Sequence, residues 1–491
     1  MAGIGIRLNR IFGKESQSLG RVIYGSVYST LATIAPMLLV IGALLLMYVV
    51  LGFSTVGYFE RELFACTVLY VFIFSLITAS PFNSVLSKYV GDRIFEERYD
   101  DILPCVYVGL ALHESFACLL GIPFCLWEYF VGGVDAYYVI TGFLAYAFLG
   151  LAFDFMLYLS ILKLYRQLSL FFFLGMLLTF LLSLLFRFVF RWSITYSMLA
   201  ALALGFFLIA VLELGFLKTY FHDNSRCYRE VFGYFGTYWK LILSNFFYVL
   251  GLFVHNFVFW TKEDMNLRLV DTFVCNQPYD MASCIAMFTN ISASVIFIAN
   301  VEMKFHARYQ AYTEAVLGGR LRDIRQAKSR MFRLLSEQVV RMVQLQFIVS
   351  VVLFLLCLIL LPRVGMSGLV MTIYPCMAAG YFALFLMYSV MLYLQYFNDL
   401  TGCVLTGGLF CAAVLAGSIL CLQLPAYWYA LGVFAGSVLG FSFAYFRVRW
   451  VERHLDEHIF CRGSLLREKR EPMPSAAVYT WLSQEEDAHE A

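Results

Sequence analysis

Long apolar segments recur along the whole chain, and they constrain its fold more than any other feature of the sequence. A helix needs about 20 apolar residues to cross roughly 30 Å of hydrocarbon. Twelve runs approach that length, and they lie near residues 31–53, 63–86, 104–127, 137–161, 167–189, 194–217, 237–260, 282–303, 342–362, 370–396, 401–423 and 427–447. We therefore expect an all-α polytopic membrane protein.

The composition agrees with lipid as the main solvent. Of the 491 residues, 62% are apolar and only 14% are charged, and the mean hydropathy is +0.77. A soluble domain carries about 25% charged residues, so this chain has too few polar side chains to cover a surface that faces water. These values exclude a soluble enzyme, a fibrous protein, a disordered protein and a secreted disulfide scaffold.

Basic residues are distributed unequally between the two ends of the predicted spans. An even number of spans places both termini on one side, and 29 of the 35 Lys and Arg residues fall on that side. Cytoplasmic loops are enriched in Lys and Arg. We therefore predict a multi-pass protein of the cytoplasmic (inner) membrane with both termini in the cytoplasm. Its partner is the lipid bilayer, and we expect no nucleic-acid partner.

The predicted spans form two groups of six, as an internal duplication would. The first residues contain no short apolar core followed by a cleavage site, so they are predicted to be an uncleaved lead-in. The residues after Arg470 are polar, and we expect them to lack a fixed structure. The predicted units are a cytoplasmic lead-in (1–28), an N-lobe (29–217), a cytoplasmic inter-lobe linker (218–236), a C-lobe (237–450) and a cytoplasmic tail (451–491).

One predicted cytoplasmic segment, residues 304–341, is longer than a turn and strongly basic. It carries nine Lys and Arg residues, and its apolar residues recur at helical intervals. Gly318 and Gly319 would interrupt such a helix. We predict a helical elbow that is held either by anionic lipid headgroups or by a cytoplasmic partner protein. The sequence favours neither alternative.

The motifs of common enzyme classes are absent. The sequence contains no GxxxxGK[ST] loop, no HExxH, no GxSxG and no CxxC pair, and its 13 cysteines are scattered, mostly within apolar runs. His113 and Glu114 are adjacent, so a helix would direct them about 100° apart. We therefore predict a transporter rather than an enzyme, with no cofactor and no metal site.

Polar side chains within the predicted spans are the candidates for a transport pathway. An ionisable group at the bilayer centre costs about 2.5–3.5 kcal/mol on insertion scales, so it persists only beside a cavity or a partner. Lining of a cavity is favoured for the deep residues Glu114 and Asp154, whereas Glu213 and Glu302 lie near cytoplasmic ends and are read as solvated carboxylates. The other candidates are His113, His255, Asn256, Asn290 and Asn300.

The deep charges are acidic, and no deep Lys or Arg compensates them. Such a cavity would attract cationic or hydroxyl-rich cargo and repel phosphorylated cargo. Its carboxylates could also exchange protons during transport. His255 has two equal readings, as a pathway residue or as a core histidine bonded to a neighbouring helix.

Several stretches resemble the PelG family of Pel exopolysaccharide export, and they occur in order along almost the whole chain. They include the opening residues Met1 to Ile6, the stretch Lys88 to Glu96, Trp260, Tyr279-Asp280, and Glu302 with Phe305. In the seventh span the chain departs from the family, which tends to carry an acid and a lysine where His255 and Asn256 stand here.

The resemblance implies a fold of the multidrug/oligosaccharidyl-lipid/polysaccharide flippase superfamily (MATE-like), with about twelve helices in two six-helix lobes around a central cavity. It also implies transport of a cationic galactosamine-type polymer across the cytoplasmic membrane. The implied partners are a cytosolic glycosyltransferase and membrane proteins that carry a cyclic-di-GMP receptor.

Together, these observations predict a polysaccharide transporter that receives nascent polymer from a cytoplasmic synthase. We place the substrate pathway at Glu114, Asp154, His255, Asn256, Glu213 and Glu302, and partner docking at Asp92, Arg93, Arg308, Arg320, Arg322 and Arg325. Two alternatives stay open. One is cation-coupled efflux of small organic cations, and the other is a membrane scaffold for a polysaccharide synthase.

Overall fold

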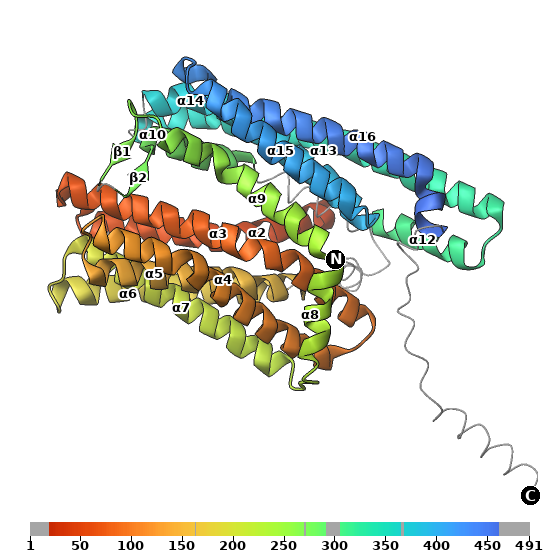
Figure 1. Ribbon diagram of the computed structural model, residues 1–491, viewed down its shortest axis with the longest axis horizontal. Coiled ribbons are helices and arrows are strands. Elements are labelled where there is room, and N and C mark those ends of the chain that lie inside the picture. Colours follow the sequence, from red (N-terminus) through yellow and green to blue (C-terminus); the bar gives the residue numbers. More distant parts are fainter. Residues whose placement is uncertain (1–18, 163, 270–271, 291–304, 365–367, 461–491) are drawn as a thin grey trace, which may run out of the picture.

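Helices make up almost all of the described chain, and most of them run along one common axis (Figure 1). The computed structural model describes residues 19–460, except 163, 270–271, 291–304 and 365–367. The predicted pathway residues Glu302 and Asn300 and the tail after residue 460 therefore lie outside the described residues. Short 3-10 turns occur at Phe53–Thr55, Tyr99–Asp101, Pro362–Val364 and Ala426–Trp428.

The first group of helices forms one lobe with its own core, which we call the N-lobe. Within it, α5 packs against α3, α4 and α7, while α6 packs against α2 and α7. An amphipathic helix, α8 (Tyr228–Thr237), leads from this lobe to the next. The helices of the N-lobe are α2 (Leu19–Val50), α3 (Tyr58–Phe95), α4 (Ile102–Phe130), α5 (Ala136–Ile161), α6 (Tyr165–Phe188) and α7 (Ile194–Tyr220).

The second group forms the C-lobe around a separate hydrophobic core. Here α15 packs against α9 and α16, and α14 packs against α10, α13 and α16. A two-residue antiparallel ladder, β1 (Leu267–Arg268) with β2 (Val274–Cys275), joins α9 to α10. The helices are α9 (Trp239–Trp260), α10 (Gln277–Asn290), α12 (His306–Gly318), α13 (Leu321–Leu360), α14 (Leu369–Tyr396), α15 (Leu400–Cys421) and α16 (Leu431–Phe460).

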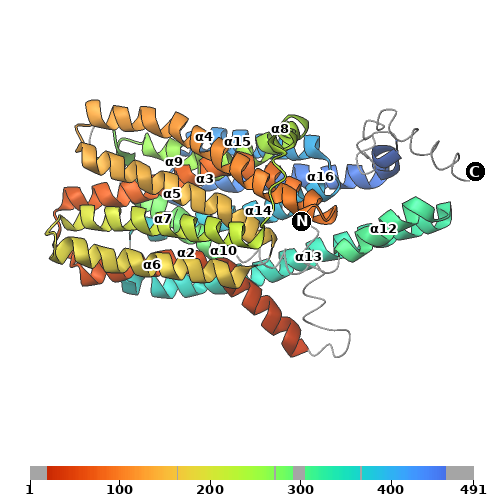
Figure 2. The same cartoon turned by 90° about the horizontal axis from the view of Figure 1, so that it is seen from below.

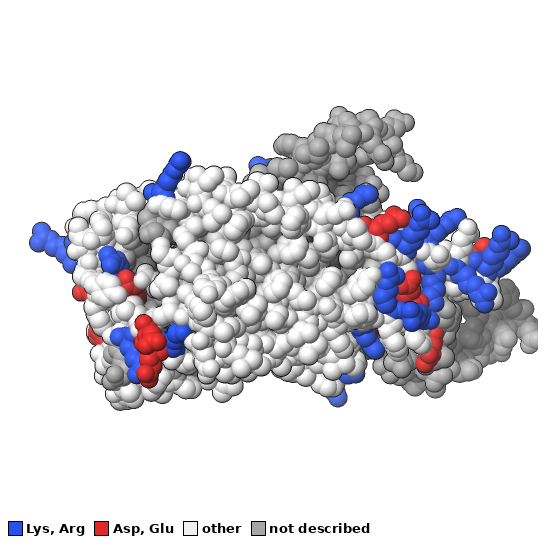
Figure 3. Space-filling model, turned by 90° about the horizontal axis from the view of Figure 1, so that it is seen from above, with Lys and Arg blue, Asp and Glu red and all other residues white. Residues whose placement is uncertain are grey.

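The predicted membrane spans agree with this architecture. Within the described part of the chain, ten helices are long and apolar enough to cross a membrane, and each contains most of one predicted span. The other two predicted spans fall on α2, whose apolar part is Ala35–Val50, and on α10 with the segment that follows it. Charged side chains gather at the two ends of the molecule and leave an uncharged belt between them (Figure 3). The fold is that of a multi-pass membrane protein.

The basic elbow is a helical hairpin that projects beyond the bundle (Figures 1 and 2). With 40 residues, α13 is about 60 Å long at 1.5 Å per residue, roughly twice the hydrocarbon thickness. The chain turns between α12 and α13 at Gly318 and Gly319, which confirms the predicted bend. A Cβ atom on Gly319 would come within 2.5 Å of the Ala315 carbonyl oxygen, so this turn requires glycine.

Close helix contacts depend on small residues. Gly205 of α7 faces Gly175 of α6, and a Cβ atom on Gly205 would stand 1.8 Å from Thr179 Oγ1 and 2.9 Å from the Gly175 carbonyl oxygen. In the C-lobe, Gly432 of α16 meets Gly417 of α15 in the same way. Small residues let membrane helices approach closely enough for dispersion contacts to hold them together.

Replacement of Gly205 by valine should destabilise the protein by about 1–3 kcal/mol, because the helices must separate to admit the side chain. We expect a lower midpoint of thermal unfolding for the purified Gly205→Val protein. Gly215→Val is the matched control on the same helix, since a Cβ atom there meets nothing within 4 Å. Equal midpoints for the two variants would contradict this account of the packing.

Candidate functional site

Three carboxylates from three helices converge inside the N-lobe. They are Glu114 of α4, Asp154 of α5 and Glu213 of α7, and Asp154 interacts electrostatically with the other two. Asp154 and Glu213 are buried, with exposed fractions of 1% and 0%, and Glu114 is half-buried. Within the described residues, Asp154 Oδ2 and both carboxylate oxygens of Glu213 have no hydrogen-bond partner.

Neighbouring residues leave room for this acidic cluster. Gly109 lies opposite Asp154, where a Cβ atom would come within 3.3 Å of Asp154 Oδ2 and 2.7 Å of Tyr158 Oη. Tyr158 Oη donates to the Cys105 carbonyl at 3.3 Å. In the orientation that satisfies its neighbours, the Asn83 amide donates to Asp154 Oδ1 at 3.2 Å. Among the described residues, the Asn83 amide is thus the hydrogen-bond donor that reaches the cluster.

The location of these carboxylates corrects the sequence-based expectation. Asp154 was expected to face a chamber between the lobes, but it packs within the N-lobe. Glu213 was expected to be a solvated carboxylate near a helix end, and that prediction is wrong because its side chain is fully buried. The reason is that α7 packs against α5 and α6, so the face that carries Glu213 points into the lobe.

A second buried carboxylate centre, around Asp280, lies in the C-lobe. Asp280 Oδ1 accepts hydrogen bonds from Asn256 Nδ2 (2.7 Å) and Trp260 Nε1 (3.0 Å), and Oδ2 accepts one from the Asn276 backbone (3.0 Å). His255 Nδ1 and Tyr279 Oη are 3.0 Å apart. Of the two readings of His255, the structure fits a core histidine bonded to the neighbouring helix.

Asp280 was missed as a site residue, because it lies just before a predicted span. A signal was present nevertheless, since Asn256 and Trp260 are four residues apart and therefore share one face of α9. Two donors on one face predict an acceptor on the facing helix. Because Asn256, Trp260 and the Asn276 backbone all donate to the Asp280 carboxylate, this group is held in place, in contrast to Asp154 and Glu213.

The two lobes meet where α3 lies antiparallel to α9. Near one end, Tyr70 stacks on Trp260 with ring centroids 4.9 Å apart, and Phe74 stacks on Phe257 at 5.8 Å. Toward the other end, Asn245 donates to the Ser80 carbonyl. The lobes are therefore in contact along much of these two helices.

A cavity of about 250 Å³ opens between α3, α4 and α5, inside the N-lobe. Aromatic rings dominate its wall, and the buried carboxylate of Glu128 contributes a polar atom. A second cavity, of about 420 Å³, lies near the β-ladder end of the same lobe. Both cavities are lined mainly by N-lobe residues, and Phe273, from the segment before α10, completes the wall of the first. The residues that line the first include Thr67, Tyr70, Phe74, Phe124, Cys125, Glu128, Tyr138, Phe143, Tyr146 and Phe273.

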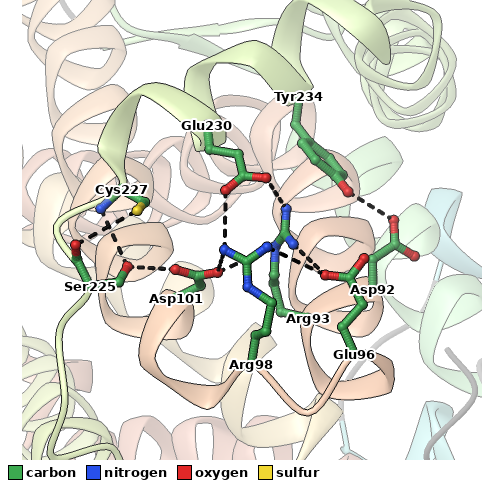
Figure 4. A network of polar contacts seen from close by, with 9 residues as sticks. All are labelled: Asp92, Arg93, Glu96, Arg98, Asp101, Ser225, Cys227, Glu230 and Tyr234. Carbon is green, nitrogen blue, oxygen red and sulfur yellow. Dashed lines mark hydrogen bonds and ion pairs between the residues drawn. The ribbon is translucent and has the colours of Figure 1, made fainter. Parts of the chain in front are cut away.

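A network of charged residues ties α8 to the end of α3 (Figure 4). Arg93 is 2% exposed, donates to Glu96 and to Glu230 of α8 (2.5 Å to the latter), and lies over the ring of Tyr89. Arg98 pairs with Asp101. The predicted role of Arg93 in docking is therefore wrong, because its guanidinium is occupied by groups of its own chain.

The remaining predicted docking residues lie on the surface. Asp92 is partly exposed and contacts Lys88 (3.4 Å) and the Tyr234 hydroxyl (3.4 Å). The predicted basic residues of the α12–α13 hairpin are all exposed, namely Arg308, Arg320, Arg322 and Arg325. This hairpin is accordingly a projecting surface of positive charge.

Comparison with solved structures shows the same fold in other membrane proteins. The chain is similar to the MATE transporter VcmN of Vibrio cholerae, with 12% identity, coverage of 90% of this chain and 100% of that one, and a TM-score of 0.59. It is also similar to a MOP superfamily transporter from Pyrococcus furiosus, with 13% identity and a TM-score of 0.59. That match covers 87% of this chain and 96% of the Pyrococcus chain. These likenesses establish the fold.

Comparison at the level of sequence identifies the family. No curated protein matches the chain. The family model for PelG, exopolysaccharide exporters (EPS-E), matches residues 1–460 and thus nearly the whole sequence. The chain therefore belongs to the PelG family of exopolysaccharide exporters, built on the fold of the MOP superfamily.

Proposed function

We propose that the protein moves a cationic, galactosamine-type polysaccharide across the cytoplasmic membrane, with both termini in the cytoplasm. The family match over residues 1–460 carries the assignment to exopolysaccharide export. The two-lobed transporter fold supports movement of the polymer by this chain itself. Rocking of two lobes against each other is a general route to alternating access.

The surface charge supports the proposed orientation. The projecting hairpin at one end carries a dense group of exposed arginines, whereas the opposite end carries few basic residues. Basic residues are retained on the cytoplasmic side of membrane proteins. On this basis the hairpin end faces the cytoplasm, and the end with β1 and β2 faces outward.

The buried charges support a cationic cargo. Among the residues whose burial is described, Arg93 is the one buried Lys or Arg, and it lies at the hairpin end of the molecule. The interior of the N-lobe instead holds Glu114, Asp154 and Glu213 with unpartnered oxygens. An unpartnered buried acceptor gains the most from a new donor, such as an ammonium or hydroxyl group of a sugar. We propose that these acids contact the cargo or its coupling ion when the lobes rearrange.

Conversion of the two acids to amides should reduce export. We expect the Glu114→Gln and Asp154→Asn variants to secrete about tenfold less polymer, which corresponds to the loss of one charge-assisted hydrogen bond. The measurement is secreted polymer at equal levels of the transporter in the membrane. Asp223→Asn, an exposed loop position, is the control. Unchanged secretion by both variants would remove these residues from the pathway.

The hairpin is the proposed docking surface for a cytosolic glycosyltransferase, and the cyclic-di-GMP receptor protein is a further proposed partner in the membrane. The hairpin projects beyond the end of the helical bundle (Figure 2), and on the proposed orientation its tip lies in the cytoplasm. Leu317 and Leu321, at the tip, are 72% and 63% exposed. Exposed leucines among arginines are suited to an acidic protein surface with an apolar pocket.

Charge reversal on the hairpin should uncouple synthesis from export. We expect Arg320→Glu combined with Arg322→Glu and Arg325→Glu to lower co-purification of the glycosyltransferase by about tenfold or more, because like charges then face each other. The matched control is Arg191→Glu with Arg363→Glu, two exposed arginines at the opposite end. Equal recovery of the glycosyltransferase with both sets of variants would contradict docking at the hairpin.

One observation favours a second candidate function, efflux of small organic cations. The aromatic N-lobe cavity of about 250 Å³ with the Glu128 carboxylate in its wall is suited to a compact cation with an apolar body. Drug susceptibility of a deletion strain separates the two candidates, since export of polysaccharide alone predicts unchanged susceptibility. A pure scaffold is distinguished by loss of export in the hairpin variants but not in the variants of Glu114 and Asp154.

A further inference from the structure

We infer that residues 272–276, which we call the closing segment, form a releasable gate at the β-ladder end of the molecule, held shut by Tyr70 and Glu128. This inference rests on the proposed transport function, because it assigns a step of that function to particular contacts. The segment follows α9 and precedes α10, so in sequence it belongs to the C-lobe. Thr272, Phe273 and Val274 nevertheless contact the N-lobe, while Asn276 anchors the end of the segment to Asp280 of the C-lobe.

The first contact is made by the hydroxyl group of Tyr70, on α3. Tyr70 Oη donates to the Val274 carbonyl oxygen at 2.6 Å and accepts from the Val274 N–H at 3.2 Å. Both polar groups of Val274 are thus satisfied by one side chain of the other lobe. A buried backbone group needs such a partner, so this tyrosine holds the segment as a neighbouring strand would.

The second contact is made by the carboxylate of Glu128, near the end of α4. Thr272 Oγ1 donates to Glu128 Oε2 at 2.6 Å, and the two side chains are 3% and 1% exposed. Gly132 makes this approach possible, because a Cβ atom there would stand 2.4 Å from Thr272 Oγ1. The other carboxylate oxygen, Oε1, has no partner among the described residues. Among the described residues, Thr272 of the closing segment is therefore the hydrogen-bond donor on which the Glu128 carboxylate depends.

The third contact is aromatic and covers the N-lobe cavity. Phe273 packs against Tyr70 (ring centroids 5.4 Å apart) and Phe124 (6.0 Å), and it forms part of the wall of the cavity of about 250 Å³. Tyr70 in turn stacks on Trp260 of α9. Phe273 thus joins the closing segment to the hydrophobic core of the N-lobe.

These contacts are suited to a gate that opens and closes, rather than to a permanent interface between the lobes. If the hairpin end faces the cytoplasm, the cargo must leave at the β-ladder end, and the lobes must separate there. The contacts that bridge the lobes through residues 272–276 must break in that step. They consist of a few hydrogen bonds and ring contacts from a short non-helical segment, which can move without unfolding a helix. The structure therefore shows this end in its closed state.

A disulfide lock tests the gate directly in the full-length protein. Cys66 of α3 and Cys275 of the closing segment are in side-chain contact, so oxidation can join this native pair by a disulfide across the gate, whereas the Cys66→Ser and Cys275→Ser proteins each keep one of the two cysteines. We expect oxidised cells that carry this pair to lose polymer secretion and to recover it after reduction. Each single-cysteine variant is the control for oxidation alone. Secretion that is equal before and after reduction, with the disulfide verified by mass spectrometry, would overturn the gate.

A labelling experiment tests the same gate without reference to the cargo. Cys125 lines the same cavity as Phe273 and is partly exposed in the closed state, so a rise in its rate of reaction with a membrane-impermeant maleimide above the wild-type rate reports opening. We expect Tyr70→Phe and Thr272→Val to raise the labelling rate of Cys125 roughly two- to tenfold. Each substitution removes a hydrogen bond that holds the gate closed, so a larger fraction of the molecules is open at any time. The label is located by peptide mapping, and a Cys125→Ser protein gives the background.

The controls are Tyr137→Phe and Thr219→Val, two exposed residues of the same types. Equal labelling rates in the gate variants and these controls would overturn the inference. Because labelling needs no polysaccharide, the gate and the proposed function can fail separately. If the gate variants are labelled faster but the disulfide-locked protein secretes normally, the segment does open, but its opening is not required for export.

Discussion

The hydrocarbon environment is the constraint on which the rest of this structure depends. In the absence of water, each backbone polar group must be satisfied within the chain, so the spanning elements must be helices. Charged side chains are confined to the two ends unless a partner or a cavity compensates them. The uncharged belt in Figure 3 is the direct consequence. Each charged side chain that is buried within that belt must therefore have a partner or a cavity that compensates it.

The buried carboxylates fall into two kinds, and the difference concerns their hydrogen bonds. Asp280 receives donors from Asn256, Trp260 and the backbone of Asn276, and this arrangement holds α9 against α10. Asp154 and Glu213 lie in an equally buried position and keep oxygens that no described residue contacts by a hydrogen bond. A satisfied carboxylate stabilises one conformation, whereas an unsatisfied one retains the capacity to bind a new donor. The N-lobe acids are therefore the better candidates for binding a new hydrogen-bond donor during transport.

Different interactions hold the two ends of the molecule together. At the hairpin end, Arg93 and Arg98 join α3 to Glu230 of α8 in a network of ion pairs, so that the connection between the lobes moves with the N-lobe. At the opposite end, residues 272–276 meet the N-lobe through Tyr70 and Glu128 and through aromatic contacts. Several charge pairs around one buried guanidinium are costly to break, because removal of one partner leaves a buried charge. Among the described residues, the contacts of residues 272–276 with the N-lobe include no ion pair and come from a short non-helical segment, so fewer interactions must break at this end.

The sequence by itself determined the membrane class, the positions of the spans, the bend at Gly318 and Gly319 and the membership of the PelG family, because hydropathy and helix breakers act locally along the chain. It did not reveal that Glu213 is buried, that Arg93 is occupied, or that Val274 binds Tyr70 across 204 residues. Helices that are apolar on all sides carry little periodicity to indicate which face turns inward. Rotation of each helix is set by its neighbours, and only the tertiary structure decided which polar groups meet.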